Sequence, residues 1–170
     1  MPIQQAIFNS PIGKLIIETT NENIAAVLFT HTLKPPPMAD ETPAAASREH
    51  PLIKKCMQQL QEYFDGKRTD FDLPLQQEGS AFQQSVWAVL NDISYGKTVS
   101  YLELSKRIGN ARAIRAVGIT NGKNAISIIV PCRRVIGSNG SLTGYGGGLW
   151  RKQWLPEHEA KFANGIQQLF

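Results

Sequence analysis

The sequence predicts an α+β protein built from two small domains, and three observations support this prediction. A chain of 170 residues can form one compact unit or two small domains packed together. Strand-like patterns occupy the first 30 residues, whereas helical apolar spacing dominates from residue 81 onward. Residues 1–78 carry 7 basic and 10 acidic side chains, against 11 and 4 in residues 79–170. We therefore expect an acidic domain over 1–78 and a basic domain over 79–170.

The composition is that of a globular protein and excludes several other classes. Hydrophobic residues make up 42% of the chain and charged residues 19%, which excludes a disordered or fibrous protein. Two cysteines are too few for a disulfide scaffold, and the N-terminus lacks a signal-peptide pattern. The longest apolar run, residues 24–29, is far shorter than the roughly 20 residues of a membrane span. We expect a cytoplasmic protein with reduced thiols and no membrane partner.

In the first domain we expect three strands, a long loop, a helix and a further short strand. Turn residues separate the strands of a meander, over residues 5–8, 14–20 and 24–30. Residues 34–47 are rich in Pro and Ala and predict a loop. Apolar residues at helical spacing predict a helix over 51–66, and Cys56 lies on its apolar stripe as a core thiol. Residues 71–75 could add the short strand.

The second domain begins with three predicted helices. The first covers residues 81–91, with its apolar residues on one face. Ser100 and Glu103 have the spacing of a capping box for the second, which stops at Gly109. The third covers residues 111–120 and follows directly, so the pair is a helix-turn-helix candidate.

The third helix is unusually slim and carries two charges. Ala113, Ala116 and Gly118 keep its surface small, while Arg112 and Arg115 are basic. Gly118 costs a helix interior roughly 1 kcal/mol relative to Ala, so a close approach to another molecule would explain it. Tight packing against a neighbouring helix requires the same small residues, and the sequence leaves both explanations open.

A cysteine with basic neighbours is the main chemical candidate. Residues 125–130 predict a buried strand, and Cys132 follows it, beside Arg133 and Arg134. Adjacent guanidinium groups favour the thiolate and lower the pKa of a thiol, although most free cysteines are inert and buried. His158 could serve as a base for Cys132 or lie on the surface of an amphipathic helix, which is the more common case.

The C-terminal segment combines a glycine-dense loop with a last helix. The loop, residues 143–148, suits close approach of backbone to a flat ligand, and it lacks the Lys-Ser/Thr ending of a P-loop. The helix covers residues 149–162, and Pro156 should kink or interrupt it.

Taken together, these segments resemble the O6-alkylguanine-DNA alkyltransferase family (methylated-DNA–protein-cysteine methyltransferases). The N-terminal half matches more loosely, through Ser10-Pro11-Ile12-Gly13 and Tyr63-Phe64-Asp65-Gly66, and resembles a small α/β domain with an RNase-H-like sheet. Dense matches in the second half are Phe82-Gln83, Val86-Trp87, Ser100-Tyr101, Arg115-Ala116-Val117-Gly118, Asn121-Gly122, Asn124, Ile129-Val130-Pro131-Cys132, Arg134-Val135-Ile136-Gly137, Gly144-Tyr145, Gly147-Gly148, Lys152, Trp154-Leu155 and His158-Glu159.

The resemblance implies DNA repair by direct transfer of an alkyl group. The family moves the group from guanine O6 in duplex DNA to its own cysteine, once per molecule and without a cofactor. We expect a monomer that binds the minor groove and flips the damaged base, with O4-alkylthymine as a second possible substrate.

The resemblance also implies a role for each matching residue. The catalytic set has Cys132 as alkyl acceptor, Tyr101 as proton donor and Asn124 as a brace for the reactive turn, with Arg133 and Glu159 beside them. The implied DNA-binding residues are Tyr101, Arg112, Ala113, Arg115, which would fill the gap left by the flipped base, Ala116, Gly118 and Asn121. The implied base pocket comprises Val135, Tyr145, Gly146 and Gly147.

One departure from the family pattern changes the expected chemistry. The family places a histidine directly after the cysteine, linked through water to the counterpart of Glu159, whereas this chain has Arg133. An arginine stays protonated and cannot accept the thiol proton. Arg133 could instead stabilise the Cys132 thiolate, with Glu159 as its counter-charge and proton removal by solvent. Pro156 could shift Glu159 relative to the cysteine.

The departure leaves a rival reading open. The chain could recognise alkylated DNA and transfer slowly or not at all, although the presence of Cys132 favours activity. A thiol hydrolase using Cys132 and His158 lacks a third orienting residue. A transcription regulator is disfavoured because the third helix offers few side chains to read the major groove.

Overall fold

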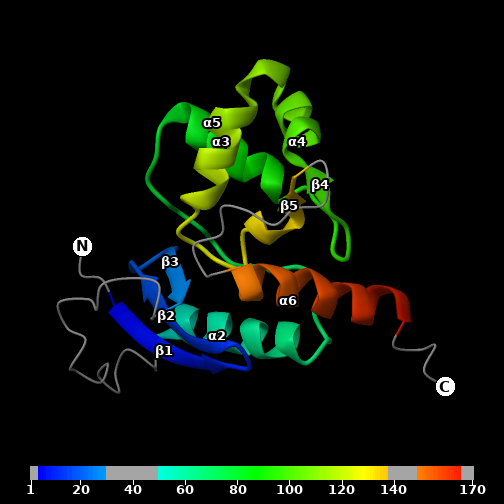
Figure 1. The fold of residues 1–170 in the computed structure, drawn as a ribbon. Helices are drawn as coiled ribbons and strands as arrows, with labels where there is room; N and C mark the ends of the chain where they lie inside the picture. Colours follow the sequence, from blue (N-terminus) through cyan, green and yellow to red (C-terminus); the bar gives the residue numbers. More distant parts are fainter. Residues whose placement is uncertain (1–3, 30–49, 138–148, 166–170) are drawn as a thin grey trace. The chain divides into compact units, whose positions relative to one another are not determined.

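The computed structural model describes residues 4–29, 50–137 and 149–165, and its contacts divide the chain into two compact units (Figure 1). The first unit comprises Met1–Gln77 and Ala125–Ile129, and the second comprises Glu78–Asn124 and Val130–Phe170. The split after Gln77 lies next to the boundary expected from the sequence. The assignment of Ala125–Ile129 to the first unit was not expected. The loop over 34–47 and the glycine-dense loop over 143–148 lie outside the described residues.

The first unit contains a three-stranded antiparallel sheet in the order β1-β2-β3, which confirms the predicted meander. Its strands are β1 (Gln4–Ser10), β2 (Gly13–Thr19) and β3 (Ile24–Phe29). Phe8 pairs with Leu15 and Ile17 with Val27, so alternate side chains turn to one face. The buried hydrophobic residues of the sheet are Ala6, Phe8, Leu15, Ile17, Ile24, Ala26, Val27 and Phe29.

Helix α2 (Pro51–Phe64) packs on this sheet, as the helical spacing predicts. It begins after His50, whose Nδ1 accepts a hydrogen bond from the backbone N–H of Leu52 at 3.1 Å. The ring of Phe64 stacks on that of Phe8 with centroids 6.3 Å apart. Cys56 is fully buried on the same side of the helix, which confirms it as a core thiol.

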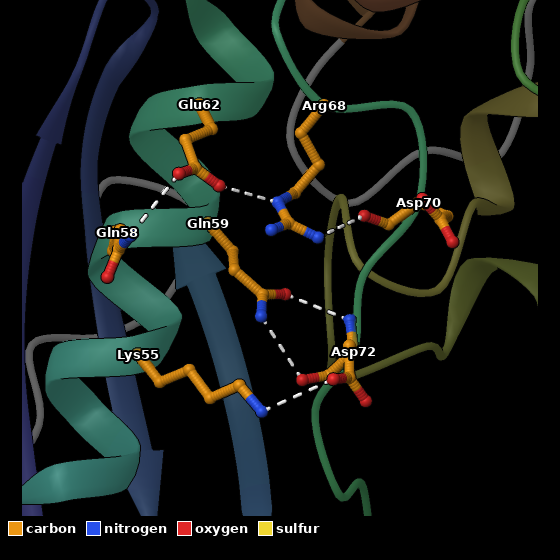
Figure 2. Close-up of polar contacts among 7 residues, drawn as sticks. All are labelled: Lys55, Gln58, Gln59, Glu62, Arg68, Asp70 and Asp72. Carbon is orange, nitrogen blue, oxygen red and sulfur yellow. Dashed lines mark hydrogen bonds and ion pairs between the residues drawn. The ribbon is translucent and has the colours of Figure 1, made fainter.

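Side chains of α2 also hold the chain that follows it (Figure 2). Gln59 donates to the carbonyl of Asp72 at 3.2 Å and accepts from its N–H at 2.9 Å. Flanking ion pairs join Lys55 to Asp72 at 3.4 Å and Glu62 to Arg68 at 2.7 Å. The strand expected over 71–75 is reduced to one parallel bridge between Leu75 and Ile24. Gln59 takes up both backbone groups of Asp72, and Pro74 has no N–H to donate, so the bridge does not extend into a longer ladder.

The prediction of a buried strand over 125–130 is wrong about the conformation of the backbone. Ala125 and Ser127 exchange backbone hydrogen bonds with Val27, both at 2.9 Å, but Ile126 forms only an isolated parallel bridge. The chain then turns at Ile128, which has a φ of 72°. A left-handed conformation is rare for a β-branched residue and ends the extended pairing. The expected burial is correct, because Ile126, Ile128, Ile129 and Val130 are all buried.

The second unit is mainly helical, as predicted. It contains α3 (Ala81–Leu90), α4 (Tyr101–Ile108), α5 (Ile114–Gly122) and α6 (Leu149–Ala160). Short elements between and after them are β4 (Val99–Ser100), the 3-10 turns η2 (Ala111–Ala113) and η3 (Cys132–Arg134), β5 (Val135–Ile136) and the π-helical turn η4 (Lys161–Gly165). Strands β4 and β5 pair in parallel.

Helices α4 and α5 form the expected helix-turn-helix. Ser100 caps α4 by accepting from the N–H of Glu103 at 3.0 Å, and Gly109 ends it with a φ of 91°. Asn110 accepts from the N–H of Arg112 at 3.2 Å and caps the next element. That element starts as the 3-10 turn η2, so the α-helix begins at Ile114 rather than at 111.

Helix α6 continues through Pro156 to Ala160 and passes into η4, so the expected interruption at Pro156 does not occur. Within the described ranges, no helix has the length and apolar character needed to cross a membrane.

Candidate active site

Cys132 lies at the start of η3, in a turn held by two asparagines. Asn124 Nδ2 donates to the carbonyl of Val130 at 3.1 Å and lies 3.5 Å from Cys132 Sγ, to which it also donates. Asn121 Nδ2 donates to the carbonyl of Cys132 at 3.2 Å. The C-terminal end of α5 and the residues after it therefore fix both the backbone and the sulfur of the turn.

The position of Asn121 corrects its expected role as a DNA contact. Its side chain is 1% exposed and donates into the cysteine turn, so it has no surface to offer DNA. Its Oδ1 is among the few buried side-chain polar atoms in the described part of the chain without a hydrogen-bond partner. Asn121 is a brace for the turn, together with Asn124.

The electrostatic environment of Cys132 differs from the sequence expectation. Burial raises the pKa of the Cys132 thiol above its ordinary value of 9.0, because a thiolate loses hydration in the interior. The hydrogen bond from Asn124 and the positive charges of Arg133 and Lys152 act in the opposite direction and lower the pKa. The expected net lowering by the arginines is wrong, since the side chain is only 4% exposed and desolvation dominates.

Both arginines after the cysteine bind the carboxylate of Glu159 in the interior. Arg133 donates to Glu159 Oε2 through Nε at 2.8 Å and through a terminal nitrogen as well. Arg134 Nε donates to Glu159 Oε1 at 2.8 Å. All three side chains are buried. The charge of Arg133 that the sequence placed beside the thiol is thus partly neutralised by Glu159.

Tyr101 and Lys152 form a second polar pair in this unit. Lys152 on α6 is fully buried, and its Nζ donates to the phenolic oxygen of Tyr101 at 3.2 Å. The ring of Tyr101 lies beside α5, where a Cβ added at Gly118 would be 3.7 Å from Cε1. Lys152, Leu155 and Glu159 have helical spacing along α6, and all three lie on a buried face of it.

The turn η2 and helix α5 each expose one arginine. Arg112, Arg115 and Ala116 are exposed, whereas Ala113 and Gly118 are half-buried. Ile119 is 54% exposed and lies one helical turn after Arg115, a position that sequence reasoning did not single out. Gly118 thus packs near Tyr101 within the unit. Ala116 is exposed and adds only a methyl group to the helix surface.

The remaining predicted residues are placed as follows. His158 is 9% exposed and stacks on Trp154 with centroids 4.7 Å apart, so its expected surface position is wrong. The ring of Phe162 lies edge-on to His158 at 4.9 Å. Val135 is buried in β5, where it pairs with Val99. Tyr145, Gly146 and Gly147 lie outside the described residues.

Sequence reasoning assigned no role to Lys152, although it matched the family pattern, and it did not foresee that Arg134 binds Glu159. For Lys152, the seven-residue spacing to Glu159 is a signal that both lie on one helix face. Among the residues that the structure describes, no group of three His, Cys, Asp or Glu side chains could hold a metal ion.

Comparison with known families accounts for both units. The ribonuclease-like domain of 6-O-methylguanine DNA methyltransferase matches residues 3–77, and the DNA binding domain of the same protein matches residues 81–161. The chain belongs to the O6-methylguanine DNA methyltransferase family. The predicted family and the predicted α+β architecture are therefore confirmed.

Individual relatives of this methyltransferase family match over most of the chain. A methylated-DNA–protein-cysteine methyltransferase of Methanosarcina acetivorans is 44% identical over 150 residues, which cover 88% of this chain and 94% of the relative. That of Mycobacterium bovis is 40% identical over 168 residues, 99% of each chain. The crystal structure of Mycobacterium tuberculosis O6-methylguanine methyltransferase superposes with a TM-score of 0.85, at 40% identity and 99% coverage of each chain. The same protein in complex with DNA gives 0.81 at 40% identity, covering 98% of this chain and 99% of that one.

Proposed function

We propose that Cys132 is the acceptor through which this methyltransferase repairs DNA, by taking the alkyl group from O6-alkylguanine once per molecule. The observation that carries the proposal is the construction of the cysteine turn. Asn121 and Asn124 fix its backbone and orient a hydrogen bond at the sulfur. The other cysteine, Cys56, lies in the apolar core of the first unit, where DNA cannot reach it.

The reaction is a direct displacement at the alkyl carbon. The Cys132 thiolate forms the new S–C bond as the C–O6 bond breaks, and the departing guanine takes up one proton. Tyr101 is the proposed donor of that proton, and Lys152 holds its phenolic oxygen at 3.2 Å. All bonds and protons are accounted for without a cofactor. O4-alkylthymine offers the same chemistry and is a second possible substrate.

The thiol proton must leave before the attack, and Arg133 cannot accept it because a guanidinium stays protonated. Arg133 supports the thiolate through its positive charge, which lowers the pKa of Cys132 against the larger effect of burial. Glu159 is the counter-charge of Arg133 at 2.8 Å. Solvent is the proposed acceptor of the proton.

DNA binding is assigned to the exposed side of η2 and α5, within a segment that carries a large positive charge. Residues 79–170 hold 11 basic and 4 acidic side chains, and phosphate attraction supplies much of the affinity of such surfaces. Arg112 and Arg115 are exposed there, beside the small side chains of Ala113 and Ala116. A slim helix suits the narrow minor groove, and Arg115 is the candidate to fill the gap of a flipped base.

Several proposed features rest on the family pattern. The base pocket would use Val135, which is buried beside the cysteine turn, together with Tyr145, Gly146 and Gly147. The proposed state is a monomer. Two free cysteines suit a reducing compartment such as the cytoplasm.

Mass spectrometry after incubation with an O6-methylguanine duplex tests the proposal. We expect one methyl group per protein molecule, on the peptide that contains Cys132, and restored guanine in the DNA. The peptide that contains Cys56 should remain unmodified, and a Cys132→Ala variant should gain nothing. Binding to the damaged duplex with no gain in mass would contradict the proposal and indicate a damage-recognition protein.

A further inference from the structure

The two oxygens of the Glu159 carboxylate have different partners. Oε2 accepts from Arg133 at 2.8 Å and from a second nitrogen of the same guanidinium. Oε1 accepts from Arg134 Nε at 2.8 Å and from the backbone N–H of Gly96 at 3.4 Å. Replacement of Arg133 would therefore remove two donors from Oε2 and leave the donors to Oε1 in place.

Arg134 makes further contacts that reach the connection between α3 and β4. A terminal nitrogen donates to the carbonyl of Ile93 at 2.7 Å, and the guanidinium carbon lies 5.6 Å from the centroid of the Tyr95 ring. This connection leads through β4 into Tyr101, the first residue of α4. Arg134 thus joins the cysteine turn, α6 and the chain that carries Tyr101.

We propose that Arg134 is a positioning residue that fixes Glu159 and the approach to Tyr101 relative to Cys132, and that residue 133 decides how the thiol proton leaves. This inference rests on the proposed function. With Arg133 in place, both nitrogen-bearing side chains on Glu159 are permanent cations, and neither can accept a proton. The proton then passes to hydroxide, which forms water and leaves the thiolate to attack.

The surroundings of the sulfur determine the expected pH dependence. The charged and titratable groups around the turn are Arg133 and Arg134 within it, Lys152 and Glu159 from α6, Tyr95 from the connection and Tyr101 from α4. Hydroxide is the base in the wild type, so the transfer rate should rise about tenfold per pH unit until the thiol itself is ionised.

Arg133→His tests whether residue 133 determines the path of the thiol proton while Arg134 holds Glu159. In Arg133→His, one ring nitrogen can donate to Oε2 in place of the guanidinium, while the other nitrogen can take the thiol proton. We expect the single-turnover rate at pH 7 to rise at least about tenfold, with a plateau above the histidine pKa near 6.5.

Arg134→Lys tests the positioning residue itself. Lysine keeps the positive charge but cannot grip Glu159 and the carbonyl of Ile93 with one planar fork. We expect the single-turnover rate to fall on the order of tenfold to hundredfold, with the slope of its pH profile unchanged. In the double variant, Arg133→His should lose most of its gain, because its partner carboxylate is no longer held.

Arg151→Lys is the matched control. Arg151 is also buried in the second unit, but its guanidinium lies over the ring of Trp150 at 4.4 Å. Its rate and pH profile should equal those of the wild type. Affinity for the damaged duplex, measured by fluorescence anisotropy, should be the same for all variants, since Arg133, Arg134 and Arg151 are all buried.

If Arg134→Lys folds, either of two results would overturn the inference. The first is that Arg133→His raises the single-turnover rate equally in the wild-type background and in the Arg134→Lys background. The second is a wild-type rate in folded Arg134→Lys. If urea denaturation shows that Arg134→Lys does not fold, Tyr95→Leu replaces it as the test, because it removes the ring beside the guanidinium. Tyr95→Leu should also lower the single-turnover rate. An unchanged rate in this variant would overturn the inference. Iodoacetamide labelling of Cys132 in the same variants needs no DNA. If iodoacetamide labels Cys132 normally but no variant accepts a methyl group, the proposed function is contradicted and the inference about Arg134 is not.

Discussion

The two cysteines of this chain are both buried, and their surroundings differ in kind. Cys56 lies on the apolar face of α2, where burial raises the pKa of its thiol from 9.0 to about 12. Burial also raises the pKa of Cys132, but Asn124, Arg133 and Lys152 all act to lower it. Depth alone therefore does not separate a structural thiol from a reactive one. The difference lies in the polar groups brought to the sulfur.

The same contrast extends to the interiors of the two units. The buried polar side chains of the first unit are neutral: Thr19, Gln59 and Ser127. Among the described residues, every buried arginine, lysine and glutamate belongs to the second unit, as Arg133, Arg134, Arg151, Lys152 and Glu159. A buried charge is costly unless it is paired, and such groups concentrate at functional sites. The interior of the second unit therefore contains paired charged side chains around Cys132, whereas the first unit is stabilised by apolar packing.

Replacing each cysteine by alanine should give the largest contrast. Cys132→Ala should abolish methyl transfer, because no other thiol lies in the cysteine turn. Cys56→Ala should keep the full transfer rate and lower the free energy of unfolding by roughly 1 kcal/mol, through lost apolar burial. Transfer assays with a methylated duplex and urea denaturation measure the two effects. A loss of transfer in folded Cys56→Ala would remove the distinction between the sites.

The polar groups at the sulfur are tested next by Asn124→Ala. The change removes the hydrogen bonds to Cys132 Sγ and to the carbonyl of Val130, and leaves that buried carbonyl without its donor. We expect a transfer rate lower by about tenfold to hundredfold, corresponding to roughly 1–3 kcal/mol. Gln58→Ala on the exposed side of α2 is a suitable control, since it removes an exposed side-chain hydrogen bond to Glu62 in the first unit. A wild-type rate for Asn124→Ala would show that the brace is dispensable.

The thiol of Cys56 should make stability depend on alkaline pH. The unfolded thiol ionises near 9.0, while the folded thiol stays protonated to about 12. The folded state then binds more protons above pH 9, so this stabilisation is complete below pH 9 and is lost as the pH rises toward 12. By pH 10.5 the loss should reach about 2 kcal/mol relative to Cys56→Ala, in which it is absent.

Urea denaturation of the two proteins between pH 8 and 10.5 measures this difference. Cys132 is present in both, so its own contribution cancels. Parallel stability curves for wild type and Cys56→Ala would contradict the assignment of Cys56 as a strongly desolvated thiol.

The smallest effect is expected from Gly118→Ala, beside the ring of Tyr101. The new methyl group would meet Tyr101 at 3.7 Å, an ordinary van der Waals contact, and glycine costs a helix interior about 1 kcal/mol relative to alanine. We expect the free energy of unfolding to rise by about 0.5–1 kcal/mol, with unchanged DNA affinity. A loss of affinity in anisotropy measurements would instead place Gly118 against DNA, the other explanation that its small size allows.

Local patterns in the sequence were sufficient for most of the elements. The strand alternation and turn residues predict the meander, the apolar stripe predicts α2 with Cys56 inside it, and Ser100 and Gly109 mark the ends of α4. These features depend on residues within a few positions of one another, so they can be recognised without knowledge of the packing. The strands expected over 71–75 and 125–130 were wrong because Gln59 and the backbone at Ile128 override their local preference.

Patterns along the sequence are enough to identify the family, the order of the elements and the cysteine of the reactive turn. The inward position of Asn121, and the division of the two Glu159 oxygens between Arg133 and Arg134, emerge only from the packing of the folded chain. The same packing also decides that burial, rather than neighbouring charge, sets the direction in which the pKa of Cys132 moves. Hydration and pairing depend on which distant segments pack around a group, and no spacing along the chain specifies them.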